Sequence, residues 1–345
     1  MRQLLISIAA ISVAAMLPMV LLAQSEITSV DYFGLRQLKQ SDIEAVLDLK
    51  TGEPLRISVS EIESRVGALD GVAEVNVAPI RYPGNLALFI GVRENDQPAM
   101  TFRDSPTGES KIDPELLKAY NQTMQMLVPA IRSGKAGEDR SAGHSVSEYE
   151  PLKELQLGFI EIANDQFDEL DTLLKESADA DSRVAAAYII AYATDKQRVV
   201  ESIHFACDDA DAGVRNNAVR ALAVLSNYAN ENPELDLHVD PTPFLQLLRS
   251  PTWTDRNKGA AAVDSISRGR DPEFLERLRT DCMNELVEMA KWKSSGHAFF
   301  SIRILARMAN FPEEVIIEKC KGLKSHEDRL NWVETLVDTI NNTDK

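Results

Sequence analysis

His204 and Cys207 are two metal-ligating side chains at helical spacing. They lie three residues apart in a segment whose apolar pattern predicts a helix, so an imidazole and a thiolate fall on one helix face. A structural zinc site takes four such ligands, and the sequence has no second pair with matching spacing. We therefore predict no metal site and interpret both side chains as packing residues.

Two acidic clusters, at 179–181 and 208–211, carry carboxylates of the kind that bind calcium. An EF-hand loop also needs a glycine at its sixth position, and the sixth positions here are Val184 and Val214. Both clusters precede segments with helical periodicity, where acidic side chains cap backbone N–H groups and favour the positive end of the helix dipole. We therefore expect these acids to be helix caps.

The sequence contains none of the motifs that mark common catalytic sites. It has no G-x-S-x-G, H-E-x-x-H, P-loop or G-x-G-x-x-G pattern. His144, His238, His297 and His326 lie in predicted loops or near helix starts, and none forms a recognisable pair with a nucleophile. We therefore predict no catalytic residue, no cofactor and a protein that is not an enzyme. A helical-repeat enzyme of undefined reaction is the third alternative for the function.

The composition is that of a globular protein with an acidic surface. The chain has 345 residues, of which 44% are hydrophobic and 26% charged, and its formal net charge is −17. This length gives room for more than one domain. A strongly negative charge disfavours nucleic acid and anionic lipid as partners.

The three cysteines, Cys207, Cys282 and Cys320, are too few and of the wrong parity for a disulfide framework. Cys282 and Cys320 fall in neighbouring predicted repeats, so one bridge in an oxidising compartment stays open as an alternative. The favoured interpretation is buried thiols that pack as small hydrophobic side chains.

Residues 4–23 form an uncharged apolar run that follows Arg2. This arrangement is typical of a signal peptide, with Ala23 as the last residue before cleavage. The run is also long enough to span a bilayer, so an uncleaved anchor is the second interpretation, and a buried helix of a soluble protein is the third. With residues 1–24 as leader, both leading interpretations export residues 25–345 to the periplasm or to the outer face of the inner membrane.

Residues 25–94 predict a small α+β domain. Apolar residues alternate in its strand-like segments and recur every three or four residues in its helix-like segments. The expected segments are strand Ile27–Phe33, a helix capped by Ser41, a helix capped by Ser58 or Ser60, strand Val72–Ile80 and strand Leu86–Val92. We expect both helices to pack on one face of a three-stranded sheet and water to cover the other face.

Short motifs mark the joints of this domain. They are Phe33-Gly34, Leu49-Lys-Thr-Gly52-Glu-Pro54-Leu55, Gly71-Val72-Ala-Glu-Val75-Asn-Val77 and Arg93-Glu94. With these motifs and this element order, the segment resembles a POTRA domain. POTRA domains occur in outer-membrane barrel-assembly proteins, two-partner secretion transporters and a division-site protein, so the resemblance implies a periplasmic docking module. No array of alternating strands follows residue 94, and we therefore exclude a barrel transporter.

The next residues predict a change to helical structure. Residues 95–112 are polar and rich in turn formers, which is typical of a linker that lets the two parts move independently. Asp113 and Pro114 start a helix, because proline is favoured at the first helical position. We expect residues 113–164 to be helical with a flexible loop at 133–147, and residues 165–345 to form an all-α solenoid.

The helical part repeats. An aspartate is followed four residues later by an arginine and then by small residues. The aligned ladder positions are Asp179, Arg183, Asp211, Arg215 and Arg256. Repeats of about 30 to 40 residues indicate stacked helix pairs. The pattern resembles HEAT repeats, in which such residues form a ladder along the inner helices, and about five pairs fill the region.

Trp253, Trp292 and Trp332 occur one in each late repeat. Large aromatic side chains fill irregular gaps between repeats, and this is our interpretation. Anchors for a bound partner are the alternative.

Together these features predict a non-enzymatic exported scaffold that binds protein partners, envelope assembly machinery among them. An extended partner segment would pair with the sheet edge along Ala73–Ile80. The residues expected to contact partners are Ala73, Glu74, Val75, Asn76, Val77 and Ala78 in this strand, and Asn216, Asn217 and Arg220 on the repeats. A membrane-tethered envelope assembly or cell-division component is the alternative, with membrane contact only if the leader is uncleaved. The oligomeric state is left open.

Overall fold

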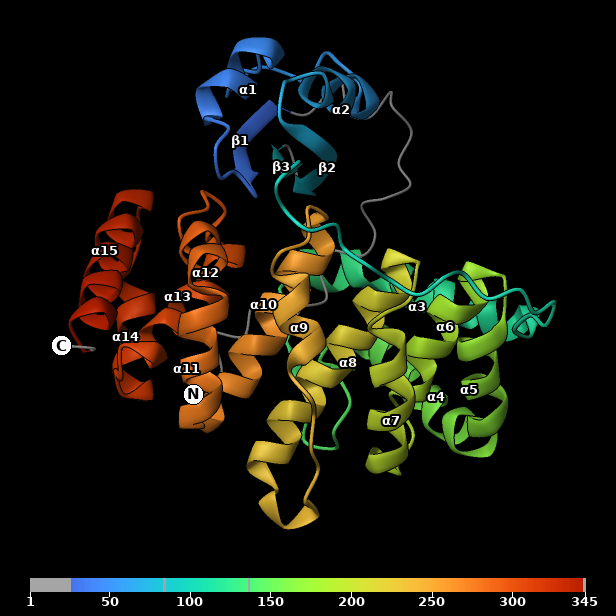
Figure 1. Cartoon of the computed structure of the whole chain (residues 1–345). Coiled ribbons are helices and arrows are strands. Elements are labelled where there is room, and N and C mark those ends of the chain that lie inside the picture. Colours follow the sequence, from blue (N-terminus) through green and yellow to red (C-terminus); the bar gives the residue numbers. More distant parts are fainter. Residues whose placement is uncertain (1–25, 83–84, 136, 344–345) are drawn as a thin grey trace. The chain divides into compact units, whose positions relative to one another are not determined.

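The computed structural model describes residues 26–82, 85–135 and 137–343 (Figure 1). They form two compact units. The first unit contains residues 101–244 and 261–269, and the second contains the described residues of 26–100, 245–260 and 270–343. The leader lies outside the described residues, so its role as signal peptide or anchor stays a prediction.

A three-stranded sheet begins the second unit. Its elements are β1 (Glu26–Phe33), α1 (Gln40–Leu47), α2 (Val59–Gly67), β2 (Val72–Tyr82) and β3 (Asn85–Glu94). β3 is central, parallel to β1 and antiparallel to β2. The predicted order of strands and helices is confirmed. Ser58 caps α2 as predicted. The N-cap of α1 is Lys39, two residues before the predicted cap Ser41.

α1 and α2 cover one face of this sheet (Figure 1). Apolar side chains at three- and four-residue spacing on the helices share a core with alternate residues of the strands. This core includes Ile43, Leu47, Ile62, Val66, Val30, Leu86, Leu88 and Ile90.

Glu94, at the end of β3, fixes the turn that follows β1. Its buried carboxylate accepts the backbone N–H groups of Arg36, Gln37 and Leu38 at 2.7 to 3.0 Å. Burial opposes ionisation, but these bonds to the charged form outweigh it and lower the pKa of Glu94. The end of the central strand is therefore tied to the start of α1.

The other face of the sheet is also buried, so the prediction of a water-covered face is wrong. Phe89 of β3 lies with its ring centroid 5.1 Å from that of Trp253 and 5.2 Å from that of Trp292. Phe33 of β1 lies 5.5 Å from Trp292. Trp253 of a helix and Trp292 of a loop between two helices of the second unit thus cover this face. The nearly unbroken apolar run Leu86–Val92 suits a strand that is buried on both sides.

Polar contacts support the same packing. The backbone N–H of Gly34 donates to Glu288 at 2.9 Å, and Asp31 accepts the backbone N–H of Lys293 at 2.8 Å. Burial raises the pKa of Asp31, although the bonds from Lys293 and the next residue oppose this effect. The sheet, α12 and the loop after α12 are therefore packed together within the second unit.

The first unit opens with α3 (Pro114–Arg132) and α4 (Glu150–Asp165). Asp113 caps α3 and Pro114 occupies its first turn, as predicted. From residue 167 on, the described α-helices follow one another along the chain as five pairs. They are α5 (Phe167–Glu176), α6 (Ala180–Ile190), α7 (Lys196–Ala206), α8 (Ala212–Glu231), α9 (Thr242–Leu247), α10 (Trp253–Ile266), α11 (Pro272–Asp281), α12 (Met283–Ala290), α13 (Ser295–Met308), α14 (Glu313–Gly322) and α15 (His326–Thr343). In the fourth pair two short helices, α11 and α12, take the place of the first helix. The helical nature of this part is confirmed, and its membership of the HEAT class stays a prediction.

The predicted linker contains a segment that is bound to the helices of the first unit. Phe102 stacks on the guanidinium of Arg215, with 3.7 Å between the guanidinium carbon and the ring centroid. Arg103 stacks in turn on Phe205 at 3.4 Å. The segment supplies the aromatic ring in the first cation–π contact and the cation in the second, and together the two contacts hold one end of the segment.

Backbone bonds hold the rest of this segment. Gly108 donates its N–H to Glu176 at 2.9 Å, and its carbonyl accepts the N–H of Ala178 at 2.7 Å. Farther on, Ile112 donates to the Ser182 hydroxyl at 3.0 Å. Backbone groups of the predicted linker are thus bonded to the end of α5, to the loop after it and to the first turn of α6.

The region predicted as a flexible loop contains a short hairpin, in which β4 (Glu138–Asp139) pairs with β5 (Val146–Ser147). The Glu138 carboxylate is buried between Arg220 and Arg140. Burial opposes its ionisation, but the two guanidinium groups outweigh this effect and lower the pKa of Glu138 to about 2. The prediction of a flexible loop is wrong here, because the polar side chains are used in buried contacts.

Candidate protein-binding site

The predicted ladder arginines make one contact that repeats. Each guanidinium donates to the carbonyl oxygen six residues before it, at 2.7 to 3.1 Å. The pairs are Arg183 with Ser177, Arg215 with Asp209 and Arg256 with Ser250. The bond closes the turn that leads into α6, α8 and α10. The arginines are therefore structural residues.

The acidic members of the predicted ladder have a different role. Asp179 and Asp211 accept backbone N–H groups in the first turns of α6 and α8 at 2.8 to 3.1 Å. The carboxylate that pairs with Arg183 is Asp209, through two bonds of 2.9 Å each. The interpretation of Asp179 and Asp211 as helix caps is confirmed, and their assignment to the ladder stays a prediction.

Asn216, Asn217 and Arg220, predicted to face a partner, are not exposed. Asn216 and Asn217 are 6% and 5% exposed, and the Asn217 amide donates to the Val184 carbonyl at 3.0 Å. Arg220 forms its ion pair with Glu138 of the hairpin. Side chains engaged in this way are unavailable to a partner, because contacts within the first unit already use them.

β2 is an edge strand, so the predicted segment Ala73–Ile80 has one side without a neighbouring strand. That side is partly blocked. The Val77 N–H donates to the Glu63 carboxylate of α2 at 3.1 Å, and Pro79, two residues farther along the same side, has no N–H. A partner strand would lose two successive backbone bonds here. Contact of Ala73–Ala78 with a partner stays a prediction that this geometry disfavours.

The opposite sheet edge, β1, is covered at Ile27 and at Val30. Ile27 donates its N–H to Glu53 at 2.9 Å and accepts the N–H of Gly52 at 2.8 Å. Lys293 donates to the Val30 carbonyl at 3.0 Å. Neither edge of the sheet therefore offers an open row of backbone groups, and strand addition requires the displacement of existing contacts.

The three cysteines are packing residues. Cys207, Cys282 and Cys320 are buried and form no disulfide, which confirms the packing interpretation. Burial raises the pKa of the Cys207 thiol and raises that of Cys282 to about 12. His204 lies 3.8 Å from Asp240. Among the residues that the structure describes, no three histidine, cysteine or acidic side chains converge as metal ligands.

The tryptophans are buried, in agreement with their interpretation as packing residues. Trp253 and Trp292 are 0% and 2% exposed and pack against the sheet, where the prediction was a gap between repeats. Trp332 is 8% exposed and lies 5.1 Å from the ring of Phe311. One side of Trp332 forms part of a groove.

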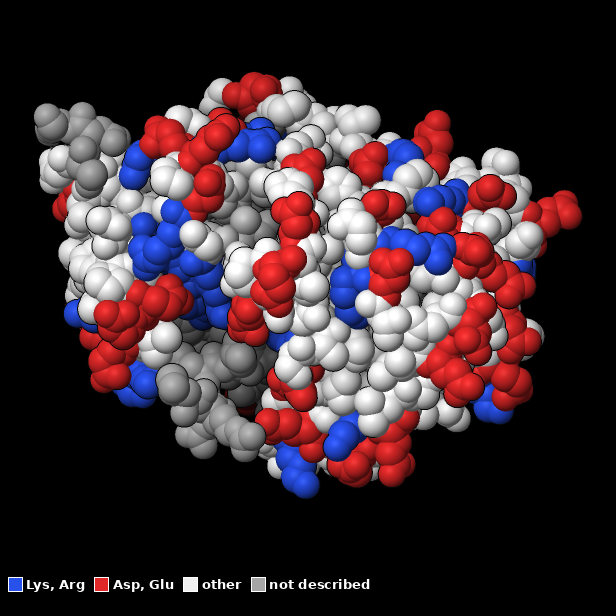
Figure 2. Space-filling view, turned by 90° about the horizontal axis from the view of Figure 1, so that it is seen from below, with Lys and Arg blue, Asp and Glu red and all other residues white. Residues whose placement is uncertain are grey.

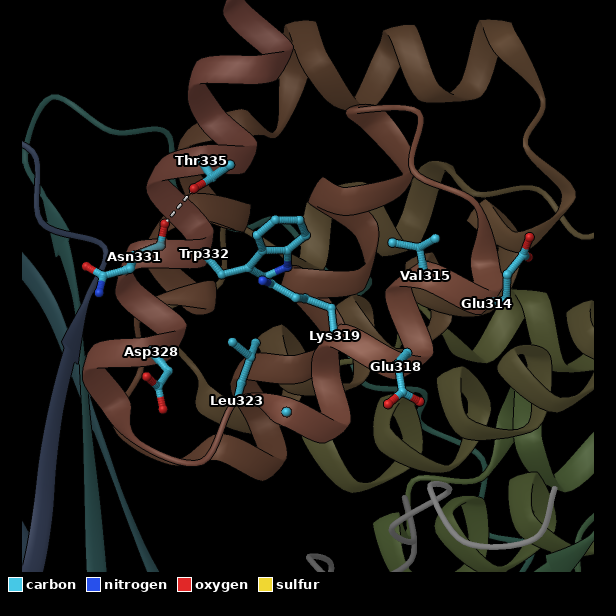
Figure 3. A pocket seen from close by; sticks show the side chains of 10 residues that line it. Glu314, Val315, Glu318, Lys319, Leu323, Asp328, Asn331, Trp332 and Thr335 are labelled. Carbon is cyan, nitrogen blue, oxygen red and sulfur yellow. Dashed lines mark hydrogen bonds between the residues drawn. The ribbon is translucent and has the colours of Figure 1, made fainter.

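This groove lies between α14 and α15 and has a volume of about 660 Å³ (Figure 3). α13 packs against both helices. The lining residues are Glu314, Val315, Glu318, Lys319, Gly322, Leu323, Asp328, Asn331, Trp332 and Thr335. Val315, Leu323 and Trp332 supply its apolar side chains, and Val315 is 41% exposed. An exposed apolar surface of this kind is a feature of sites that bind another molecule.

The polar lining of the groove is mostly acidic. Glu314, Glu318 and Asp328 carry negative charge, and Lys319 is the single basic side chain of the lining. The ammonium of Lys319 lies 4.9 Å from the ring centroid of Trp332. Asp328 accepts the backbone N–H of Ser325, and this bond lowers its pKa, so the carboxylate is ionised at neutral pH. The groove thus combines an apolar floor with an excess of negative charge.

Sequence reasoning missed this groove. Val315 and Ile317 are exposed apolar residues on α14, whereas Ile316 and Cys320 face the core. Three consecutive apolar residues, Val315-Ile316-Ile317, cannot all lie on the one buried face of a helix. This run was the available sequence signal for an exposed apolar surface on α14. The separation of α14 and α15 depends on tertiary packing, which local periodicity does not define.

The surface view agrees with the acidic composition. On the face shown in Figure 2, Asp and Glu side chains are widespread and Lys and Arg occur in smaller groups between them. The prediction that nucleic acid is not a partner stays a prediction, and this face has no broad basic area to oppose it. Among residues 26–343 that are described, no helix has the length and apolarity needed to cross a membrane.

Comparisons with known proteins give no family. No protein-family model matches the sequence, and no curated protein matches it. Among solved structures, a computationally designed armadillo repeat protein for modular peptide recognition has a TM-score of 0.38 and 18% identity, covering 66% of this chain and 98% of its own. An engineered protein gives 0.38 and 18%, with 67% and 98% covered, and another designed armadillo repeat protein gives 0.35 and 18%, with 66% and 99%. The description of this chain as helical repeats rests on its own helices.

Proposed function

We propose that this protein is a non-enzymatic scaffold that binds a protein partner in the groove between α14 and α15. The observation that carries the proposal is the groove itself, which leaves Val315 exposed beside Leu323 and Trp332 at the end of the helical array. Apolar side chains cost free energy when they face water, and a partner's apolar side chains relieve that cost. A groove between two helices suits a helical or extended segment.

The other surfaces predicted to bind a partner are occupied by contacts within the molecule. The predicted partner residues on α8 are used internally, and both sheet edges are partly or wholly covered. The groove is therefore the better supported surface. The POTRA resemblance and the apolar leader add the proposal that the protein works outside the cytoplasm, in the periplasm or at the outer face of the inner membrane.

Site-specific photo-crosslinking in the native cells tests the proposal. A photoreactive amino acid is placed at Val315, which lines the groove, or at Ile317, which is 40% exposed on the same helix but does not line it. We expect a discrete crosslinked protein from Val315 and none from Ile317, and we expect Trp332→Leu to abolish it. Equal crosslinking from both positions, or none from Val315, would exclude the groove as the binding site.

The location is tested by the N-terminal mass of the protein from fractionated cells. A start near Gln24 or Ser25 in the soluble envelope fraction supports an exported scaffold. An intact Met1 in carbonate-extracted membranes supports the tethered assembly component. Recovery of the intact chain in the cytoplasm would refute export.

A further inference from the structure

Trp332 already has a cation on its ring. Lys319, one of the exposed residues of α14, extends across the groove so that its ammonium lies 4.9 Å from the indole centroid. Figure 3 shows this side chain reaching toward the nitrogen-bearing end of the indole. An aromatic face attracts a cation through its quadrupole, so the indole ring of Trp332 is a cation-binding site within the groove, called the cation seat below.

The contact between Lys319 and Trp332 is poorly matched in one respect. The indole N–H of Trp332 is buried and has no hydrogen-bond acceptor among the described residues. An ammonium is also a donor only, so Lys319 cannot satisfy that N–H. A partner that brings a cation and a carbonyl oxygen together would satisfy the ring face and the indole N–H at once.

The charge around the seat is negative beyond what Lys319 neutralises. Glu314, Glu318 and Asp328 line the same groove. Glu318 has a distant, exposed pairing with Lys321, 3.9 Å away, and solvent screens such a pair strongly. A basic side chain that enters the groove is therefore attracted by three carboxylates of the lining.

We propose that the groove recognises a basic amphipathic segment of another protein, and that a Lys or Arg of this segment replaces Lys319 on the indole of Trp332. Apolar side chains of the segment pack on Val315 and Leu323, and its other basic residues face Glu314 and Glu318. This proposal rests on the proposed function, because it names the partner chemistry of the same groove. Lys319 is then an internal placeholder that the partner displaces.

Binding of two synthetic helical peptides tests the proposal. Both carry the same apolar face, and they differ in having lysines or glutamines at the flanking positions. The full-length chain is labelled with 5-fluorotryptophan, and the Trp332→Leu variant assigns one of its three fluorine resonances. Trp253 and Trp292 are buried against the sheet and serve as internal references for the fold. We expect the lysine peptide to shift the Trp332 resonance alone, with an affinity that falls as salt rises.

Variants of two lysines on the same helix isolate the cation seat. Lys319→Met removes the placeholder, and Lys321→Met removes an equal charge from an exposed position outside the groove lining. We expect Lys319→Met to tighten binding of the lysine peptide about two- to fivefold more than Lys321→Met does. Glu314→Gln with Glu318→Gln should weaken the same peptide and flatten its salt dependence, without a change in the Trp253 and Trp292 resonances.

The outcomes separate this proposal from the proposed function. Equal binding of both peptides, with equal effects of the two lysine variants, overturns the basic-segment proposal and leaves a neutral peptide groove. Failure of both peptides to bind overturns it as well. If the Val315 crosslink persists in that case, the groove still binds a partner, of different chemistry. If the crosslink is absent too, both proposals fail.

Discussion

Removal of Asp209 should open the first unit locally, because its carboxylate is half of a buried ion pair. The side chains of Arg183 and Asp209 are 2% and 3% exposed and share two bonds of 2.9 Å. In Asp209→Ala the guanidinium keeps its bond to the Ser177 carbonyl but is left with a buried, uncompensated charge. Breaking one side of such a pair costs about 3 to 5 kcal/mol.

Hydrogen exchange read by mass spectrometry is the suitable assay for this change. The three tryptophans lie in the second unit, so tryptophan fluorescence would not report on α6 and α8. A cost of about 3 to 5 kcal/mol corresponds to a loss of protection of roughly 10² to 4 × 10³ in the amides of these helices, at about 1.4 kcal/mol for each factor of ten.

Asp168→Ala is the matched control. It breaks the ion pair between Asp168 and Arg198, whose side chains are 92% and 48% exposed. Exposed pairs contribute about 0 to 1 kcal/mol, so protection should change by less than about fivefold. If Asp209→Ala and Asp168→Ala lower protection equally, the assignment of a structural role to the buried pair is wrong. The double variant Arg183→Leu with Asp209→Leu should cost less than Asp209→Ala, since it leaves no buried charge.

Three further perturbations test other parts of the fold. Gly91→Ala places a Cβ 1.9 Å from the Pro251 carbonyl oxygen and 2.5 Å from the Phe33 ring. This overpacking should destabilise the second unit by about 1 to 3 kcal/mol, measured by urea unfolding followed by tryptophan fluorescence. Gly67→Ala, whose Cβ would meet only Val75 at 3.9 Å, should have no such effect. Glu94→Ala removes the acceptor of three backbone N–H groups and should raise the exchange rate of the Arg36, Gln37 and Leu38 amides, whereas Glu74→Ala, at an exposed residue, should not. Burial and the nearby Lys196 lower the pKa of His144 to about 4 from 6.5, so the unfolded chain binds more protons between these values. The contribution of His144 to the stability of the first unit should therefore fall by about 3 kcal/mol as pH drops from 6.5 to 4, and should level off below that. His144→Gln should flatten this dependence in hydrogen exchange, and an unchanged slope would refute the role of His144.

Local signals predicted several elements correctly. The alternation in Ile27–Phe33, the cap at Ser58 and the Asp113-Pro114 helix start each act within a few residues of the chain, so the sequence contains them directly. The repeated arginine was visible for the same reason, because its bond spans only six residues.

Features that depend on distant residues were not predicted. The second buried face of the sheet requires Trp253 and Trp292, which follow Phe89 by more than a hundred residues. The segments 101–112 and 137–147 have polar compositions, and composition alone does not show whether polar groups bond to water or to protein. Phe102 was the one local signal, as an aromatic residue in an otherwise polar stretch.

The ladder arginines connect these two kinds of feature. Each makes the same short-range bond, yet the remainder of each guanidinium has a different long-range contact. Arg183 pairs with Asp209 of the following repeat, Arg215 stacks under Phe102, and Arg256 lies under Phe33 at 4.8 Å. A position that recurs for a local reason is thus used to attach segments that do not recur. Under the proposed function a partner binds where no segment of the chain has docked, and the groove between α14 and α15 meets that condition among the described surfaces.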